Sequence, residues 1–246
     1  MGKKGRLGKE RFGYGMPVDA PLYARPPIYY RDVEAISITY ETDEDAALDL
    51  LPEGLELTPP ALASVIFVHY PFSTLGPYEE AMLGLSCAFR GNPKFYIAHI
   101  VLNSDVPLAA GREIWGYPKK FAHVTFEKER DLVIGVMERP RGNRVCTAVV
   151  RPERPLQPVP PVKGFGTVSL RVIPSPDASQ EPSLAELIEV PPGSTPIDGY
   201  EGAGSLDFNT PSDIDPWHRL AVKRIVSAVY RRYDMVLHPG RVIKRY

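Results

Sequence analysis

The 246-residue chain has few of the residues that build metal or disulfide sites, with two cysteines, Cys87 and Cys146, and five histidines. The cysteines form no CxxC pair and no Cys/His ligand spacing, and the histidines show no HxH, HxxxH or HExxH spacing. The pattern therefore supports neither a zinc site nor a disulfide framework, and we expect both cysteines to be buried free thiols.

Long apolar runs and an excess of either charge are also missing. No uncharged apolar run approaches the ~18 residues that span a bilayer, and the basic opening stretch MGKKGRLGKERFGYGMP has no apolar segment behind it. With 29 Lys+Arg against 30 Asp+Glu, no basic stripe is present to bind nucleic acid. We expect a cytoplasmic protein with no membrane or nucleic-acid partner, a loose basic tail over residues 1–20 and one domain over 21–246.

Proline and glycine, in contrast, are abundant at 27 and 20 residues, and they divide the sequence into short segments typical of β structure. Roughly ten strands are predicted, because several runs alternate in polarity or are wholly apolar. The clearest runs are 33–40, 63–70, 83–89, 95–102, 122–126, 131–137, 145–150 and 168–173. The run 151–161 (RPERPLQPVPP) is predicted to be an extended connector between two halves of the sheet, because its prolines interrupt a strand ladder.

Two helices are predicted to pack on the outside. The first, over 42–51, has Thr42 as its N-cap, acidic residues in its first turn and Pro52 just after its end. Its apolar face comprises Ala46, Leu50 and Leu51. The second, over about 215–233, presents an apolar stripe of Leu220, Ile225 and Val229 opposite basic residues.

The segment GREIWGYPKKFA, residues 111–122, places two adjacent lysines, Lys119 and Lys120, among aromatic and small apolar residues. A lysine with an ordinary pKa of about 10.4 is almost wholly protonated at neutral pH, whereas a nucleophilic lysine must present a free amine. Burial disfavours the charged form, and a second ammonium nearby disfavours it further. Because neighbours on an extended segment point to opposite faces, we predict that burial acts on Lys119 more strongly than Lys120 does.

This segment resembles the signature of the acetoacetate decarboxylase family, in which Gly-Arg-Glu is followed by Tyr/Phe-Pro-Lys-Lys. Further ordered matches extend the likeness from about Pro21 to the end: YYRDVEAISITYETDEDAALDLLPEGLEL, LGPYEEA, VSLRVIPSPD, LAVKRIVSAVY and MVLHPGRVI. We expect an α+β, β-rich domain whose antiparallel sheets curl into a closed or cone-like β-barrel, with a few packed outer helices and Lys119 inside. The resemblance also implies a homo-oligomer.

Residue by residue, the resemblance implies that Lys119 forms an imine with substrate and that Lys120 is its cationic neighbour. Glu80 corresponds to the glutamate of the family's acidic turn, and Glu79 is a lower-ranked alternative. Arg31 corresponds to the arginine of the opening segment. Arg31 would hold a departing carboxylate or order Glu80, and Glu80 would move protons.

The pocket implied by the resemblance also includes Tyr117. Arg112 and Glu113 either belong to this pocket or form a structural ion pair, and Trp115 is expected in the core. Family decarboxylases carry a second pocket glutamate on the strand before the acidic turn, and Val65 stands at the expected place here. This departure predicts a less acidic pocket and leaves the substrate open.

The activity implied is that of a cofactor-independent lyase. A neutral Lys119 would attack acetoacetate or a related β-keto acid, and the resulting imine would accept the electron pair released as CO2 leaves. No metal or organic cofactor is expected, and the partner is a small keto acid. Two alternatives stay open, namely an imine-dependent aldolase or dehydratase acting on pyruvate or other 2-oxo acids, and a noncatalytic binding module that retains the fold.

Overall fold

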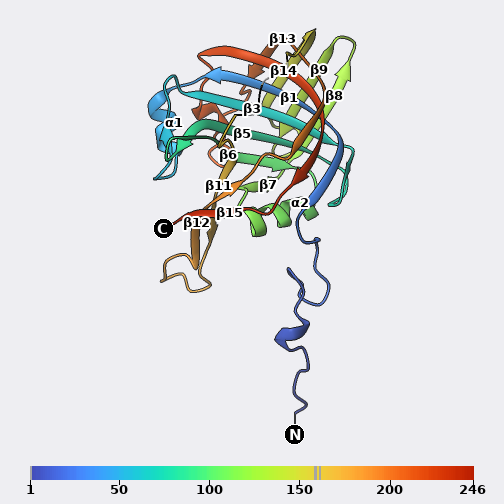
Figure 1. Ribbon diagram of the computed structural model, residues 1–246, viewed down its shortest axis with the longest axis vertical. Coiled ribbons are helices and arrows are strands. Elements are labelled where there is room, and N and C mark those ends of the chain that lie inside the picture. Colours follow the sequence, from blue (N-terminus) through green and yellow to red (C-terminus); the bar gives the residue numbers. More distant parts are fainter. Residues whose placement is uncertain (1, 158–159, 161) are drawn as a thin grey trace.

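Strands account for most of the secondary structure in the computed structural model, which describes residues 2–157, 160 and 162–246 (Figure 1). The strands are β1 (Ile28–Glu41), β2 (Glu56–Leu57), β3 (Leu62–Tyr70), β4 (Phe72–Ser73), β5 (Tyr78–Phe89), β6 (Asn92–Leu102), β7 (Lys119–Phe121), β8 (His123–Glu129), β9 (Leu132–Glu138), β10 (Arg144–Pro155), β11 (Thr167–Ile173), β12 (Leu184–Val190), β13 (Ser194–Asp207), β14 (Arg224–Leu237) and β15 (Arg241–Arg245). The α-helices are α1 (Glu44–Leu50) and α2 (Asp105–Ala110). Three short helical turns are η1 (Lys9–Arg11), η2 (Gly111–Trp115, a π-helix) and η3 (Trp217–Arg219).

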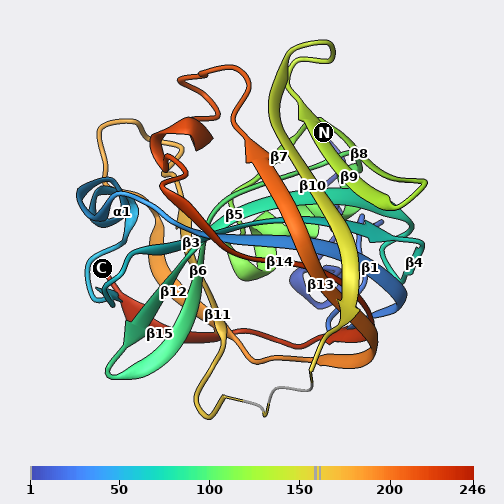
Figure 2. The ribbon, with the colours of Figure 1, turned by 90° about the horizontal axis from the view of Figure 1, so that it is seen from above.

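All these strands join one sheet in the order β15-β12-β11-β6-β5-β3-β1-β14-β13-β10-β9-β8, with β2, β4 and β7 paired at its side. Neighbours are antiparallel except that β6 pairs in parallel with β11 and with β7. The sheet curls strongly (Figure 2), so β8 contacts β3, β5 and β6. In the part of the chain that is described, the end strands β15 and β8 do not pair with each other. The β-rich prediction is therefore confirmed, whereas the pairing does not close the predicted barrel.

The eight runs predicted as strands each overlap an observed strand, but the helix predicted over 215–233 is wrong. Only Trp217–Arg219 is helical there, as a 3-10 turn, and β14 begins at Arg224. β14 pairs with β1 on one side and β13 on the other. The segment is rich in β-branched and aromatic residues, and hydrogen-bonding partners on both edges favour the strand over a helix that would bury only one stripe.

The prediction of an extended connector over 151–161 is also partly wrong. β10 continues through Pro155, and its residues pair with β13 across a register shift between Pro152 and Arg154. An irregular, bulge-like pairing tolerates prolines that a regular central ladder would not. Residues 158, 159 and 161 of the predicted connector lie outside the described residues.

The first predicted helix is present as α1, and its apolar residues pack against the core as expected. Its N-cap, however, is Asp43 rather than Thr42. The Asp43 carboxylate accepts hydrogen bonds from the backbone N–H groups of Asp45 and Ala46 at 3.1 and 3.2 Å. A capping side chain must lie directly before the first helical residue, and the helix begins one residue later than predicted.

Side chains on the central strands alternate between two faces, and each face has its own apolar core. On β3, Val65 and Phe67 enter one core, which also contains Trp217. Val68 and Tyr70 enter the other core, which contains most of the buried tyrosines and packs against α2 and η2. The alternation of a strand thus decides which side chains can share a cavity.

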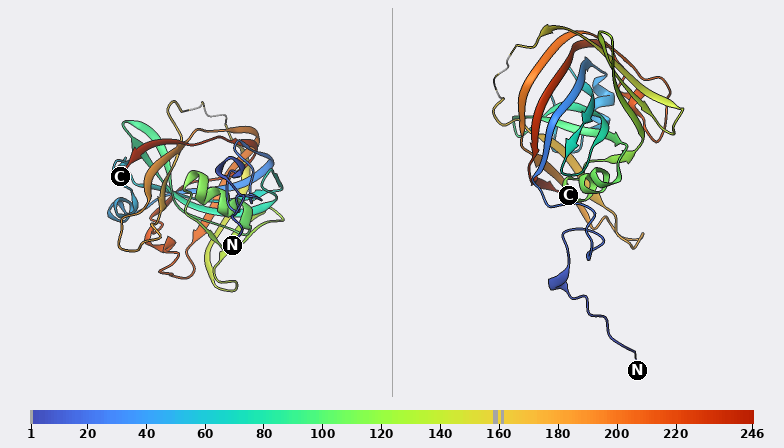
Figure 3. Two further views of the ribbon diagram at one scale, coloured as in Figure 1. Left: turned by 90° about the horizontal axis from the view of Figure 1, so that it is seen from below. Right: turned by 90° about the vertical axis from the view of Figure 1, so that its right-hand side faces the viewer.

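The N-terminal residues lie apart from the sheet. Residues 2–12 extend below it in Figure 1 and in the right-hand view of Figure 3, and most of their side chains are exposed. Tyr23 is the first buried apolar side chain of the described chain. The boundary at residue 20 stays a prediction. No helix within the described ranges is long and apolar enough to cross a membrane.

Candidate active site

Lys119 is presented by a helix, a tight turn and a short strand. The helical segment α2–η2 ends at Gly116, whose φ of +69° lies in the left-handed region. The Tyr117 N–H donates to the Gly111 carbonyl at 3.0 Å, and β7 begins two residues later. β7 pairs with β6 in parallel, opposite Ile100. This arrangement directs the Lys119 side chain into the tyrosine-rich core.

Two glycines of the GREIWG run, Gly111 and Gly116, lie where a side chain would collide with neighbouring atoms. A Cβ on Gly111 would lie 2.5 Å from Cδ and 2.6 Å from Cε of Lys119, so the lysine stem packs directly on the bare backbone. A Cβ on Gly116 would collide with the backbone of Arg171, and the left-handed φ disfavours a side chain there in any case. The glycine spacing of this segment is therefore set by the approach of the lysine and by the turn.

Lys119 and Glu80 form a buried ion pair. The Lys119 Nζ lies 2.7 Å from the Glu80 Oε2, and the two side chains are 6% and 4% exposed. Glu79 turns to the other face, where its Oε1 lies 2.9 Å from His69 Nδ1. Glu80, rather than Glu79, is thus the carboxylate that Lys119 contacts.

Tyrosines enclose this pair. The Tyr70 hydroxyl donates to Glu80 Oε1 at 3.2 Å. The Lys119 Nζ lies 5.6 Å from the ring centroid of Tyr78 and 5.9 Å from that of Tyr117, within range of cation–π attraction. Burial and then the negative charge of Glu80 raise the pKa of the surrounding phenols, which therefore remain protonated donors. These tyrosines are Tyr30, Tyr70, Tyr78, Tyr117 and Tyr233.

The Lys120 side chain points away from the Lys119–Glu80 pair. Its Nζ lies 3.1 Å from Asp215 Oδ1, and Arg139 Nη1 lies 2.8 Å from the other oxygen of this 2% exposed carboxylate. Burial and the positive charge of Lys120 lower the pKa of nearby His99 to about 4. The implied cationic neighbour of Lys119 therefore faces away from the Lys119–Glu80 pair, because successive strand residues point to opposite faces.

Arg31 is not brought to Lys119 within one chain either. Its side chain is 51% exposed, with Nε 3.8 Å from Asp234 Oδ2, and its Nη1 donates to the Tyr30 carbonyl at 3.0 Å. The pairing of β1 shifts register between Tyr30 and Val33. Tyr30 enters the tyrosine-rich core, and Arg31 consequently points outward.

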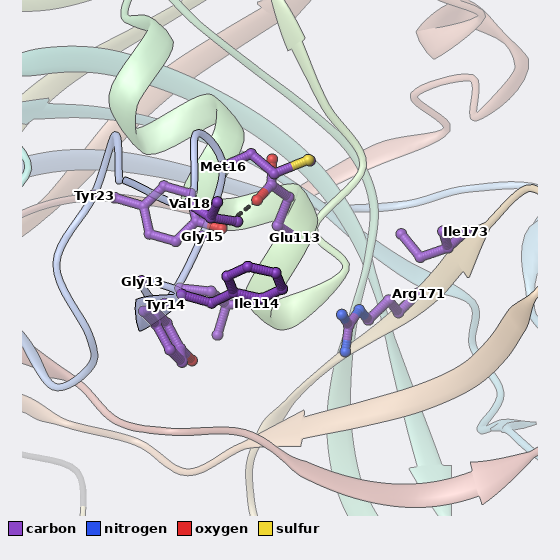
Figure 4. A pocket seen from close by; sticks show the side chains of 11 residues that line it. Gly13, Tyr14, Gly15, Met16, Val18, Tyr23, Glu113, Ile114, Arg171 and Ile173 are labelled. Carbon is purple, nitrogen blue, oxygen red and sulfur yellow. Dashed lines mark hydrogen bonds between the residues drawn. The ribbon is translucent and has the colours of Figure 1, made fainter. Parts of the chain in front are cut away.

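Arg112 and Glu113 take different partners rather than forming the ion pair considered above. The Arg112 Nη1 donates to the Lys119 carbonyl at 3.1 Å, which supports the backbone at the lysine. Glu113 accepts a hydrogen bond from the Tyr23 hydroxyl. Figure 4 shows this contact at a cavity of about 510 Å³ that lies between the N-terminal segment and η2, with Arg171 on its far side. Lys119 and Glu80 do not line that cavity.

In residues 2–157, 160 and 162–246, no group of three or more His, Cys, Asp or Glu side chains could hold a metal ion. The site brings together an amine, a carboxylate and several phenols.

Comparison with known proteins shows the family of this chain. The sequence profile of the acetoacetate decarboxylase (ADC) family matches residues 15–246, which include Glu80 and the whole lysine segment. The chain belongs to the acetoacetate decarboxylase family. Acetoacetate decarboxylase 2 of Mesorhizobium japonicum is 32% identical over 238 residues, which cover 95% of this chain and 89% of that protein. Acetoacetate decarboxylase of Acidiphilium cryptum is 31% identical over 238 residues, with 95% of each covered.

Solved structures share the fold. The crystal structure of acetoacetate decarboxylase from Legionella pneumophila superposes with a TM-score of 0.87 at 27% identity, covering 100% of this chain and 99% of that one. The enduracididine biosynthesis enzyme MppR, complexed with pyruvate, superposes with a TM-score of 0.82 at 22% identity and covers 96% and 99%. At 22% identity, the likeness to MppR shows a shared fold and nothing more.

The predicted place of Val65 in the pocket of this acetoacetate decarboxylase family member is wrong. Val65 lies opposite Leu83 and enters the core on the far face of the sheet from Lys119. The β3 residues that pack in the tyrosine-rich core are Ile66, Val68 and Tyr70. A one-residue offset on a strand moves a side chain to the other face, so Val65 does not occupy a pocket position. None of these three β3 side chains carries a carboxylate, and the Tyr70 hydroxyl is their one polar group.

Sequence reasoning missed Tyr70, Tyr30 and the packing of Gly111 on the lysine. Tyr70 is separated from Glu80 by a turn and reaches it only through the pairing of β3 with β5. The alternation of β3 could have placed it on one face but not beside Glu80. The prediction for Trp115 is confirmed, since it is buried and its Nε1 donates to the His238 carbonyl at 2.9 Å.

Proposed function

We propose that this acetoacetate decarboxylase family member is a lyase that decarboxylates acetoacetate or a related β-keto acid through an imine on Lys119. The observation that carries the proposal is the buried Lys119–Glu80 pair, 2.7 Å apart and walled by aromatic rings. A buried amine beside a carboxylate has a proton acceptor in contact and little water to stabilise its cation.

The reaction follows from this geometry. Glu80 takes a proton from Lys119, and the free amine attacks the keto carbon and expels water to form a protonated imine. The carboxylate then leaves as CO2, and the electron pair of the broken C–C bond moves toward the imine nitrogen to give an enamine. Protonation of the enamine carbon and hydrolysis by water release the ketone and restore the amine. Glu80 serves the proton transfers, and Tyr78 and Tyr117 exclude water.

A trapping experiment tests the proposal. Acetoacetate and pyruvate are offered separately, adducts are trapped with borohydride, the modified residue is found by mass spectrometry, and CO2 is measured in parallel. We expect an adduct on Lys119 and CO2 from acetoacetate, and neither in Lys119→Met. Pyruvate is the second probe because MppR, which shares the fold, has been solved with it. An adduct without CO2 would indicate an aldolase or dehydratase, and no adduct from either acid would favour a binding module.

We also propose that the chain forms a homo-oligomer. Tyr29 and Phe72, 43% and 54% exposed, lie beside Arg31 on the adjoining strands β1 and β4 and supply apolar surface for contact between copies. Light scattering after size-exclusion chromatography measures the mass directly. A mass of 27.3 kDa would contradict the proposal.

A further inference from the structure

The second oxygen of Glu80 has a partner that the reaction above does not use. While Oε2 faces Lys119 at 2.7 Å, Oε1 accepts the Tyr70 hydroxyl at 3.2 Å. Tyr70 lies at the end of β3 and is 4% exposed. Its phenol is therefore a fixed donor to the carboxylate, shielded from water that would otherwise compete for that oxygen.

The Tyr70 ring is held by its neighbours. Its centroid lies 4.9 Å from that of Tyr30 and 4.5 Å from that of Tyr78. The hydroxyls of Tyr30 and Tyr78 lie 3.3 Å from each other. Tyr30 and Tyr78 are thus engaged with one another, whereas the hydroxyl of Tyr70 is engaged with Glu80.

We infer that Tyr70 is a positioning residue that holds the Glu80 carboxylate with Oε2 toward Lys119. A hydrogen bond to a charged acceptor is stronger than one between neutral groups, so it holds the acceptor in a fixed orientation. Burial keeps Tyr70 itself protonated, because its pKa is raised well above the ordinary value. Its meaning for catalysis rests on the proposed function. The other groups facing Glu80 are Lys119 from β7, Tyr78 from β5, Tyr30 from β1, Tyr233 from β14 and Tyr117.

The test follows the environment of the Glu80 carboxylate directly. The protein is labelled with ¹³C at the side-chain carboxyl carbon of glutamate, and its NMR spectrum is recorded at one fixed pH, with Glu80→Gln identifying the Glu80 signal. In Tyr70→Phe, which removes only the hydroxyl, we expect the Glu80 signal to move, because the carboxylate loses a hydrogen-bond donor. Tyr40→Phe is the matched control, because Tyr40 is also buried but lies in the other core, where its hydroxyl donates to the Leu220 carbonyl. Thermal melts verify that each variant folds.

A second readout is the kinetics of acetoacetate decarboxylation. In Tyr70→Phe we expect kcat to fall about tenfold with KM nearly unchanged, because Glu80 is held less firmly toward Lys119. In Tyr40→Phe we expect both constants to stay near those of the wild type. An unchanged Glu80 signal in Tyr70→Phe, or an equal change in Tyr40→Phe, would overturn the inference. If the wild type traps no keto acid, the proposed function fails, and the NMR comparison still decides the role of Tyr70.

Discussion

Among single residues, Glu80 and Glu79 show how adjacent carboxylates acquire different roles. Glu80 contacts Lys119 in a buried site, whereas Glu79 contacts His69 on the other face of β5. A buried carboxylate next to an amine can accept its proton, and a carboxylate on the opposite face cannot. The contrast makes the pair a matched test of the proposed mechanism.

We predict that Glu80→Gln lowers the rate of acetoacetate decarboxylation about 100-fold or more, because the amide keeps the shape but cannot take up the proton of Lys119. Glu79→Gln should retain most of the activity. Initial rates of CO2 release at saturating substrate measure both variants. Equal losses in the two variants would remove Glu80 from the proton-transfer role.

Lys120 gives the second prediction at this scale. Its amine is bound to Asp215, which keeps Arg139 as a partner when the lysine is removed. Lys120→Met should therefore lower the free energy of unfolding by about 1–3 kcal/mol, while imine trapping on Lys119 stays within about tenfold of the wild type. Denaturant titration and borohydride trapping measure the two effects. Complete loss of trapping with an intact fold would show that the charge of Lys120 governs Lys119.

Among elements, the α2–η2–β7 unit positions the lysine through close backbone packing. We predict that Gly111→Ala reduces trapping on Lys119 about 100-fold, because the new Cβ displaces the lysine stem from Glu80. Gly199→Ala is the control, since its Cβ would meet neighbours no closer than 3.4 Å. Circular dichroism checks that both variants fold, and trapping unaffected by Gly111→Ala would refute this packing argument.

His99 on β6 makes the stability of the fold depend on pH. His99 on this strand has its pKa lowered to about 4, first by burial and then by Lys120. Between the unfolded value of 6.5 and about 4, the unfolded chain binds the proton and the folded chain does not, so stability falls as the pH decreases through this window. The full effect is roughly 3 kcal/mol.

We predict that His99→Leu flattens the decline in the free energy of unfolding between pH 6.5 and 5, measured by urea titration at each pH. This interval avoids most of the titration of carboxylates such as Glu34 and Glu189, whose pKa values are lowered by their cationic partners. A variant that loses stability as steeply as the wild type over this interval would contradict the assignment to His99.

For the whole molecule, the two cysteines report on the integrity of separate cores. Both are buried as predicted, Cys146 in the core that contains Val65 and Cys87 in a smaller cluster. Burial raises the pKa of Cys87 to about 12, so little reactive thiolate is present at neutral pH. We predict that a thiol reagent labels neither cysteine before unfolding and both together at the unfolding transition, as followed by mass spectrometry in urea. Rapid labelling of the native protein would contradict the packing.

Much about this protein could be predicted from the sequence by itself. Local alternation located the strands, and the spacing around Lys119 together with the ordered matches identified the family, because these signals are carried by neighbours along the chain. Each of these features depends on residue types at short spacing.

The features that depend on pairing between distant strands were decided only by the tertiary structure. β14 has a helix-like pattern, yet it becomes a strand because β1 and β13 supply partners on both edges. The outward turn of Arg31, the far-face position of Val65 and the contact of Tyr70 with Glu80 all follow from strand register, which one residue of offset reverses. Register is set by the contacts of distant segments, and for that reason the local pattern could not determine these positions.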